Sequence, residues 1–373
     1  MFERGQLMKD LHSFAWYAAK ISPYLPKEAF KPVPARLFGG LAYFLVMLAG
    51  IISISLFSLP IWANLLISVV IGLSFAGLGF LGHEILHGTV VRKPLLRDFL
   101  GAIAFFPFNT GPKLWRKWHN LNHHVHTQHE EHDPDTWATA EAIVNNRFFL
   151  MLFKIPKFIR SIGYVLFLCI NFTVHSTRMF FTFIKDFKKD KRYYVVLEWL
   201  LPWATWIALF VILGPFKWTF AYLVPALIGN FIVSSYIATN HNLNPQTPVN
   251  DPLANSLSVT VPKWVNVLHF NFSYHTEHHL FPGMSSKFYP LVKEKIKEMW
   301  PERYHEMSMQ RAMITLIKTP RIYWNEIDLV DLRANMAYGS LGAGLNPKEL
   351  QKRNIDLMND VVEIKNKMLS KGK

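Results

Sequence analysis

Residues 37–87 decide the fold, and they read LFGGLAYFLVMLAGIISISLFSLPIWANLLISVVIGLSFAGLGFLGHEILH. This stretch contains no Asp, Glu, Lys, Arg or His before His83. A single membrane-spanning helix needs about 20 apolar residues, so the run is about twice as long as one helix requires. Ser58-Leu59-Pro60 suits a tight turn, because proline breaks the interior of a helix. We therefore predict two membrane helices, at about 37–58 and 62–82, that form a hairpin.

A second apolar stretch, residues 193–240, carries only two charged side chains, Glu198 and Lys217. The sequence Gly-Pro-Phe-Lys at 214–217 interrupts it, because glycine and proline together are a strong signal for a turn. This pattern predicts a second pair of membrane helices, near 195–213 and 218–239. The expected fold class is an all-α integral membrane protein with four transmembrane helices in two hairpins.

The composition agrees with a membrane protein. Of 373 residues, 51% are hydrophobic, 15% are aromatic and only 18% are charged, and so much apolar surface needs lipid or a very large core. The formal net charge of +14 suits an anionic membrane surface, an acidic partner or nucleic acid. The apolar stretches favour membrane lipids, so we expect no nucleic-acid partner. The single cysteine, Cys169, excludes an intrachain disulfide framework and a cysteine-rich metal site.

Lysine and arginine predict the orientation, because short cytoplasmic loops carry an excess of both. The turn at 58–64 has neither, and the turn at 214–217 has only Lys217. The segment before the first span holds six, namely Arg4, Lys9, Lys20, Lys27, Lys31 and Arg36. Both hairpin turns are therefore expected outside and the remainder in the cytoplasm, with a histidine-rich helical cap on that side. Two shorter apolar runs, 99–108 and 161–174, are expected to lie in the membrane interface.

Three parts of the chain follow from this topology. We expect a cytoplasmic N-terminal segment at 1–36, a membrane domain at 37–285 and a cytoplasmic helical region at 286–373. The first 20 residues lack the apolar core of a cleavable signal peptide, so internal spans are expected to drive insertion. The last four residues, Ser370-Lys371-Gly372-Lys373, carry no endoplasmic-reticulum retrieval signal, which favours a bacterial cytoplasmic membrane.

The histidines gather where the predicted hairpins end. His83 and His87 stand four residues apart, so both imidazoles project from one helix face. A second group repeats this spacing at His119 and His123, with His124 turned further round the helix, and a third has the spacing i, i+3 and i+4. The candidate metal ligands are His83, His87, His119, His123, His124, His241, His275, His278 and His279. Imidazole suits iron, zinc, copper and nickel, and this number of ligands predicts two metal ions on the cytoplasmic side.

Other polar residues near these groups have less defined roles. Four acidic residues are candidates to accept hydrogen bonds from the ligand imidazoles, and a role as solvated surface residues is equally open for each. They are Glu84, Glu277, Asp133 and Asp135. Structural or surface roles are expected for His126, His129 and His132, and no catalytic role for His12, His175 and His305. His269 is ambiguous, and Asn240 is a candidate to hold a metal-bound water.

Three motifs resemble the histidine boxes of membrane fatty acid desaturases and the related hydroxylases. They are HEILH at 83–87, HNLNHH at 119–124 and HTEHH at 275–279. The likeness extends over about residues 37–290 and includes the order of the hairpins and the spacing of the boxes. The segment NFSYHTEHHLFPG at 271–283 is especially similar to the acyl-lipid desaturase branch.

The resemblance implies that the nine histidines bind two iron ions and that O2 is a co-substrate. The implied reaction removes two hydrogens from adjacent carbons of a fatty acyl chain, with an acyl-lipid as the favoured substrate. The third box begins with His275 where front-end desaturases usually have glutamine, and the His-Pro-Gly-Gly haem motif of a fused cytochrome b5 domain is missing. These departures imply a separate electron donor, either ferredoxin-like or cytochrome b5-like.

Two alternatives remain open. A membrane di-iron hydroxylase or ketolase acting on a lipid, alkane, sterol or carotenoid would use the same ligands, so the boxes alone do not separate it from a desaturase. A metal transporter would place its ligands near the middle of the membrane, whereas these histidines lie at or beyond the predicted helix ends.

Overall fold

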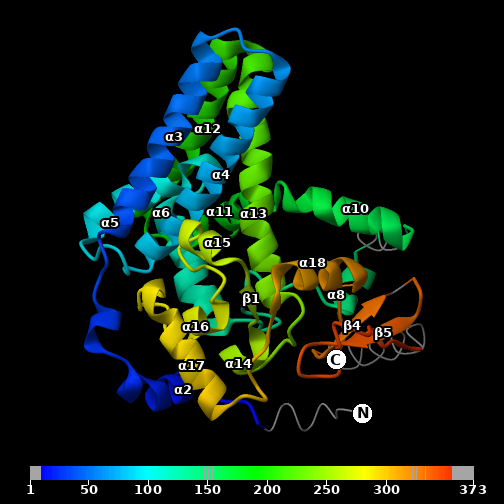
Figure 1. The fold of residues 1–373 in the computed structure, drawn as a ribbon. Coiled ribbons are helices and arrows are strands. Elements are labelled where there is room, and N and C mark those ends of the chain that lie inside the picture. Colours follow the sequence, from blue (N-terminus) through cyan, green and yellow to red (C-terminus); the bar gives the residue numbers. More distant parts are fainter. Residues whose placement is uncertain are drawn as a thin grey trace.

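The computed structural model describes residues 10–354, apart from 147, 149–150, 153–154, 321, 325 and 332. The predictions for residues 1–9 and for 355–373, including the retrieval-signal argument at Ser370–Lys373, lie outside the described residues. The described chain is mostly helical, as expected. A tall bundle formed by α3, α4, α12 and α13 stands on a wider body of short helices, loops and strands (Figure 1).

Two candidate membrane helices form the first hairpin. α3 covers Arg36–Leu56 and α4 covers Ile61–Leu86, with Pro60 as the residue that precedes α4. Both helices are long and apolar enough to cross a membrane. α4 continues four residues beyond the predicted end at 82, so His83 lies inside the helix. The sequence locates the first hairpin and its turn to within a few residues.

A third candidate, Lys189–His241, has 53 residues and folds back on itself at Gly214. The chain passes through α12 (Lys189–Trp218), the π-helical turn η6 (Thr219–Leu223) and α13 (Val224–His241). Gly214 has φ 74°, a conformation that glycine adopts without steric cost. The Trp218 indole donates to the Trp206 carbonyl at 2.9 Å, and the rings of Trp206 and Tyr222 stack at 4.1 Å. These contacts between residues 12 and 16 positions apart require a reversal of the chain.

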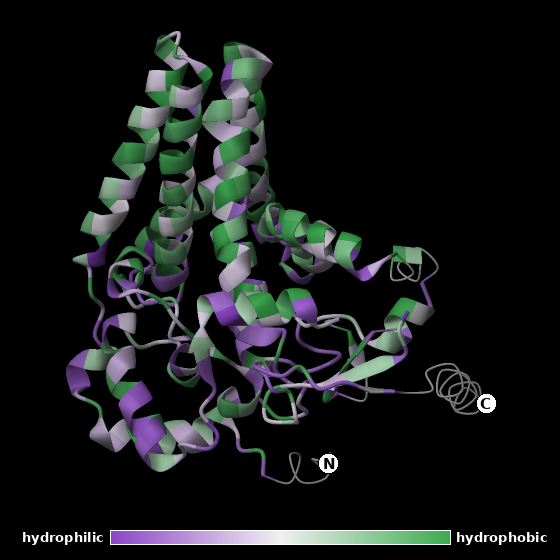
Figure 2. Cartoon of the chain, turned by 45° about the vertical axis from the view of Figure 1, so that its right-hand side comes forward, coloured by the Kyte–Doolittle hydropathy of each residue, from purple (hydrophilic) through white to green (hydrophobic). Residues whose placement is uncertain are grey.

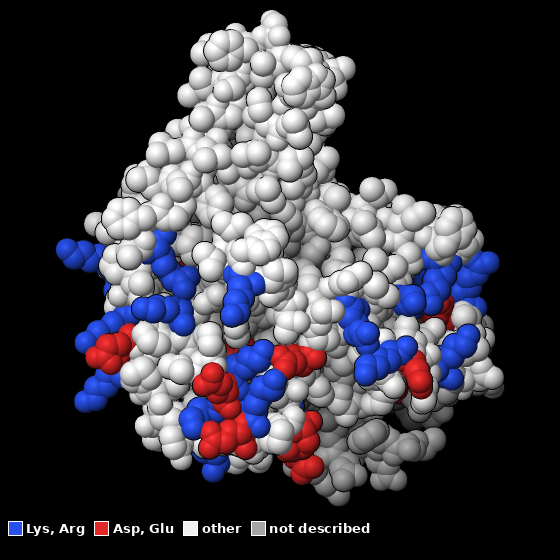
Figure 3. All heavy atoms as spheres, in the orientation of Figure 1, with Lys and Arg blue, Asp and Glu red and all other residues white. Residues whose placement is uncertain are grey.

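The surface of the bundle is largely apolar, and most charged side chains lie on the body, with Lys217 at the hairpin turn as an exception. Green, hydrophobic residues predominate along the bundle in the view of Figure 2, and in Figure 3 every visible Lys, Arg, Asp and Glu lies below it. The most apolar part of α4 is 67% buried, against 17% for α3, so α4 is the central helix. It packs between α3 and α13, with Ile71 and Phe75 fully buried.

Close packing of α4 against α13 depends on Gly72. A Cβ atom at this position would lie 2.7 Å from Ile228 Cβ and 3.0 Å from the Pro225 carbonyl oxygen. We expect Gly72→Val to destabilise the protein by about 1–3 kcal/mol, because neither the branched Cβ nor the backbone can move aside. Gly163→Val is the matched control, since nothing lies within 4 Å of a Cβ there. Equal thermal unfolding of both variants in detergent would contradict this packing.

The two shorter apolar runs do not continue the bundle. The first forms α5 (Pro94–Phe105) and η3 (Phe106–Phe108). The second forms α10 (Lys157–Leu168) and α11 (Asn171–Phe183), which bend by 72° where they meet. Figure 1 shows α10 projecting sideways from the bundle. Its exposed Phe158, Ile162 and Leu166 follow an i, i+4, i+8 pattern, which places them on one helix face.

The body below the bundle brings the N-terminal segment against the third histidine box. α2 (Phe14–Ile21), α16 (His275–Leu280) and α17 (Tyr289–Met299) share one buried apolar cluster. β1 (Ser258–Thr260) pairs in parallel with β2 (Glu306–Ser308), directly before α18 (Met309–Lys318). The other short elements are η1 (Ser22–Tyr24), η2 (Lys27–Phe30), α6 (Pro112–Trp115), η4 (Arg116–His123), α7 (His124–His126), α8 (Ala140–Val144), η5 (Ile184–Asp186), α14 (Pro252–Asn255), α15 (Lys263–Leu268) and η7 (Ser286–Phe288).

The expected all-α fold class and the expected helical region at 286–373 do not hold in the described residues beyond α18. Four antiparallel strands form a sheet there, in the order β3 (Tyr323–Trp324), β4 (Asp328–Asp331), β5 (Met336–Gly339) and β6 (Arg353–Asn354). Leu329 pairs with Tyr338 across β4 and β5. Asn335 supplies the left-handed conformation, φ 51°, just before β5. The strands have two to four residues, which is too short for an alternation of apolar and polar residues to show in the sequence.

Candidate metal centre

Four separate parts of the chain deliver the nine predicted ligand histidines to one place. α4 carries His83 in its last turn and is followed by His87 as its C-cap residue, while α13 ends at His241. The other groups come from η4 with α7, and from α16. Eight of the nine are largely shielded from solvent. Seven of them are buried, namely His83, His123, His124, His241, His275, His278 and His279, and His119 is shielded to a lesser degree.

The Nε2 atoms of these histidines approach one another closely. Nε2 of His278 lies 3.0 Å from that of His124, and His124 lies 3.1 Å from His119. One group that could hold a metal ion consists of His83, His87, His119, His124 and His278. A second consists of His123, His241 and His279. His275 joins the second group, with its Nε2 2.7 Å from His241 and 3.0 Å from His279.

The second box is not an ordinary α-helix. Residues Arg116–His123 form a π-helix, in which hydrogen bonds run from i to i+5 rather than i+4. His119 and His124, five residues apart, therefore face the same group, while His123 faces the other. His119 also lies close to His123, because these two histidines and Asp135 make a third group that could hold a metal ion. The π-helix distributes one box between two groups.

Hydrogen bonds on the outer side fix the tautomers of several ligands. Nδ1 of His241 faces the Asn255 carbonyl at 3.1 Å, and Nδ1 of His123 faces the Asp133 carboxylate at 2.9 Å. Both partners can only accept, so each Nδ1 carries the proton. Thr127 donates its own proton to the His123 carbonyl, which leaves its oxygen to accept from His279 Nδ1 at 3.2 Å. The Nε2 lone pairs of these three rings are therefore free and point inward.

Burial keeps most of the ligand rings neutral. Burial, and then the neighbouring histidines, hold the pKa values of His124, His275, His278 and His279 well below their usual range. Burial lowers the pKa of His119 to about 4. His123 differs: burial lowers its pKa, but Asp133 and Asp135 outweigh burial and raise it to about 9. The two carboxylates thus favour a positive charge on the His123 ring, which a proton on Nε2 supplies without a metal and a cation in place of that proton would supply with one.

The residues fit a bound metal pair. Converging Nε2 lone pairs without protons between them have no hydrogen-bonding solution, whereas a metal ion satisfies several at once. His87 Nε2 is buried with no hydrogen-bond partner, as are both side-chain polar atoms of Asn240 beside His241. A ring of imidazoles with no cysteine suits iron, zinc, copper or nickel. Asn240 directly precedes His241 at the end of α13, and its role in holding a metal-bound water stays a prediction.

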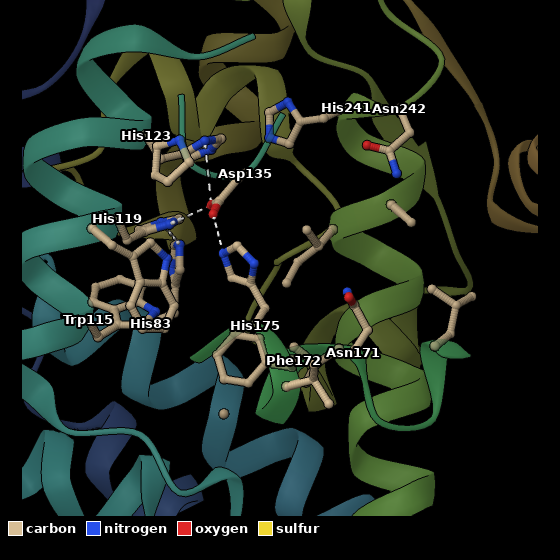
Figure 4. A pocket seen from close by; sticks show the side chains of 18 of the residues that line it. His83, Trp115, His119, His123, Asp135, Asn171, Phe172, His175, His241 and Asn242 are labelled. Atoms are coloured by element: carbon tan, nitrogen blue, oxygen red, sulfur yellow. Dashed lines mark hydrogen bonds and ion pairs between the residues drawn. The ribbon is translucent and has the colours of Figure 1, made fainter. Parts of the chain in front are cut away.

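Two aspartates follow the second box, and the structure connects both to the ligands. Asp133 binds His123 directly, while Asp135 lies between three histidines (Figure 4). Its carboxylate accepts from His175 Nε2 at 2.7 Å and lies 3.6 Å from His123 Nδ1 and 4.0 Å from His119 Nδ1. His175, which the sequence left without a role, therefore reaches the ligands through Asp135. It lies far from every box in sequence, so spacing carries no signal for it.

The two glutamates inside the boxes do not contact ligand imidazoles. Glu277 accepts from Ser258 Oγ at 2.6 Å and from Tyr304 Oη at 2.5 Å, and burial raises its pKa. Glu84 accepts from Thr89 and from the backbone of Ser286. Both carboxylates hold neighbouring segments of the body around the box helices. Their role is therefore to support the backbone rather than to orient the rings.

The remaining histidines lie outside the centre. His269 Nδ1 lies 3.0 Å from the Tyr236 hydroxyl, and His12 stacks on Trp16. His305 is half-buried, and desolvation lowers its pKa to about 4. The rings of His126, His129 and His132 form a separate cluster on the outer side of the loop after the second box.

A cavity of about 260 Å³ ends at the histidines. Its walls come from α4, α11, α13 and the second box, and apolar side chains such as Phe80, Phe172 and Val233 line it. His175 and Asp135 face it from one side, with His83, His119 and His123 beside them (Figure 4). The cavity can therefore take an apolar chain and bring part of it beside the metal-binding groups.

Apolar helices around a buried, histidine-rich centre define a class of membrane oxidoreductases. The chain belongs to the fatty acid desaturase family, whose model matches residues 60–311. This assignment confirms the family indicated by the three histidine motifs.

Several named relatives are desaturases. The sn-1 oleoyl-lipid 12-desaturase of Synechocystis sp. is 26% identical over 79% of this chain and 85% of its own length. The acyl-lipid (9-3)-desaturase of Borago officinalis is 24% identical over 83% of this chain and 74% of its own. The chloroplastic omega-6 fatty acid desaturase of Spinacia oleracea is 24% identical over 68% of this chain and 58% of its own.

Proposed function

We propose that this chain introduces a cis double bond into the acyl chain of a membrane lipid, with O2 as co-substrate. The observation that carries the proposal is the apolar cavity that ends beside the two histidine groups. Two iron ions would be held by His83, His87, His119, His124 and His278, and by His123, His241, His275 and His279. An acyl-lipid is the favoured substrate because the relatives are named for oleoyl-lipid and acyl-lipid desaturation.

An unactivated methylene has no acidic proton, so side-chain acids and bases cannot attack it. The iron pair, when bound, supplies the oxidising chemistry that removes hydrogen from such a carbon. The chain's own residues position the reactants. Phe80, Phe172 and Val233 exclude water and hold an acyl segment, while Asp133 and Asp135 fix the rings that face it. Close positioning of this kind contributes much of the rate in enzymes.

The proposed membrane topology has four spans in two hairpins. α3 and α4 form the first, and the reversal at Gly214 divides Lys189–His241 into the second. Both turns, at 57–60 and near 214, would lie outside the cell, and the charged body with its helical cap in the cytoplasm (Figure 3). The favoured location is a bacterial cytoplasmic membrane.

The electrons would come from a separate ferredoxin-like or cytochrome b5-like donor. No haem motif of a fused cytochrome b5 domain occurs in the sequence. The basic surface of the body, with a formal net charge of +14 over the chain, suits an acidic protein of this kind.

Expression in a host that lacks desaturases tests the proposal. We expect new cis-unsaturated acyl chains in the membrane lipids, identified by mass spectrometry with assignment of the double-bond position. Hydroxylated or keto products would show instead that the same ligands serve a hydroxylase or a ketolase. Unchanged lipids, with bound iron and a competent donor confirmed, would exclude acyl chains as the substrate.

A further inference from the structure

Two asparagines line the cavity beside the metal-binding groups. Asn171 is the first residue of α11, and Asn242 directly follows α13 as its C-cap residue. Asparagine at a helix end commonly bonds the neighbouring backbone through its side chain. Here the backbone N–H of Asn242 makes the cap, at 3.0 Å from the Ala238 carbonyl, and neither side chain has a hydrogen-bond partner among the residues that the structure describes. Both amides are therefore available to whatever fills the cavity.

The two amides lie in a wall where water is scarce. Asn242 is only 5% exposed, and Asn171 is half-buried. Figure 4 shows both on the side of the cavity away from His83. By contrast, the nearby buried Asn244 donates to the Asn240 carbonyl at 2.9 Å, as buried amides normally do. Two amides without such partners indicate a polar ligand, because a buried polar group that stays unpaired costs free energy.

Three other polar side chains of the cavity wall need no ligand. Asp135 and His175 bind each other at 2.7 Å, and Thr136 donates to the Gln128 side chain at 3.2 Å. Arg178 also lines the cavity, but its side chain is exposed, so water can solvate the guanidinium. The two amides differ from these groups, because a hydrocarbon chain that displaced water from the cavity would leave them unpaired.

The end of α10 brings the same wall to the level of the membrane boundary. Leu168, the last residue of α10, lines the cavity three residues before Asn171. The exposed apolar face of α10 suits the boundary between lipid headgroups and acyl chains, where amphipathic helices lie. The ester that joins an acyl chain to glycerol lies at this boundary, and its carbonyl accepts hydrogen bonds from amide N–H groups. A carbonyl bound at this wall lets the hydrocarbon run on toward the histidines.

We propose that Asn171 and Asn242 form a polar subsite for the ester group of a lipid-linked acyl chain. The inference rests on the proposed desaturase function and adds a rule for the position of the double bond. An anchored ester fixes the number of carbons between its carbonyl and the metal-binding groups, so the new bond is counted from the carbonyl end. Such anchoring away from the reacting carbons is how binding positions a substrate for reaction.

Ester-linked and ether-linked lipids test the subsite. The iron-loaded protein, supplied with a competent donor, is compared in nanodiscs that contain either a diacyl phosphatidylcholine or its dialkyl ether analogue, which lacks the carbonyls. We expect the parent to desaturate the ester-linked chain about tenfold faster in kcat/KM, the cost expected for a buried amide that loses its partner. Asn242→Leu keeps the side-chain size without the amide. It should lower the ester rate to the ether rate and leave the ether rate unchanged, which also shows that the variant is folded.

Asn242→Gln retains an amide and should recover part of the preference for the ester. Asn145→Leu is the matched control, because Asn145 is exposed at the end of α8 and does not line the cavity. Equal rates on the two lipids in the parent, or a full ester preference in Asn242→Leu, would overturn the subsite while the desaturase function stands. A parent that desaturates neither lipid, with iron and donor confirmed, would instead remove the proposed function and the subsite with it.

The position of the new double bond is a second readout. The parent should give one position, whereas the double variant Asn171→Leu and Asn242→Leu should spread the bond over neighbouring carbons of the ester-linked chain. General damage to the fold would lower the amount of product without moving the bond. A single, unchanged position in the double variant would contradict the anchor.

Discussion

His278→Ala will remove double-bond formation and reduce bound iron, each by more than about a hundredfold. His278 is buried, and its Nε2 lies 3.0 Å from that of His124 within the five-histidine group. Its Nδ1 contacts the Tyr289 hydroxyl at 2.9 Å, which fixes the ring. Changes to outer-shell partners alone lower metal affinity 10–100-fold, so loss of a ligand should cost more.

The measurement compares unsaturated fatty acids and iron per chain between the parent, His278→Ala and His12→Ala. His12 lies outside both histidine groups, so its variant controls for loss of any one histidine. Equal amounts of folded protein are confirmed by size-exclusion chromatography in detergent. Parental iron and product in His278→Ala would refute its assignment as a ligand. Lost product with parental iron would instead give it a role in the reaction only.

The sequence predicts the first hairpin and the convergence of the nine histidines because both depend on local patterns. An uncharged run longer than one span requires a turn, and histidines at helix ends must meet where the helices return. The bounds of α3 and α4 accordingly lie within a few residues of the predicted ones. Division of the ligands between two groups is different, because it depends on the π-helix at 116–123. No simple sequence rule distinguishes i+5 from i+4 hydrogen bonding.

Two other features also depend on tertiary structure. His175 reaches the centre only because α11 packs beside the second box and places its ring on Asp135. The sheet β3–β6 consists of strands of two to four residues, too short for alternation of apolar and polar residues to show. Both features depend on packing between segments far apart in the sequence. The predicted hairpins depend instead on long apolar runs, which the sequence shows directly.

Asp133→Asn should lower iron affinity about 10–100-fold while the protein still folds. One carboxylate oxygen of Asp133 accepts from His123 Nδ1 at 2.9 Å, and the other accepts from Gln128 N at 2.7 Å. Both partners donate protons, so asparagine must turn its own NH2 group toward one of them. A buried donor facing a donor costs about 1–3 kcal/mol and frees the His123 ring from its inward orientation.

The experiment separates orientation of the ring from support of the fold. Unfolding of the iron-free protein measures the cost to the fold, and iron loss to a chelator at a temperature where both proteins stay folded measures the cost to the site. Asp186→Asn is the control, since its ion pair with Lys117 at 3.2 Å is partly solvent-exposed and contributes at most about 1 kcal/mol. If iron loss follows stability alone, Asp133 merely anchors the loop. If iron leaves faster at equal stability, the carboxylate acts through His123, because a fixed ring keeps its lone pair directed at the metal.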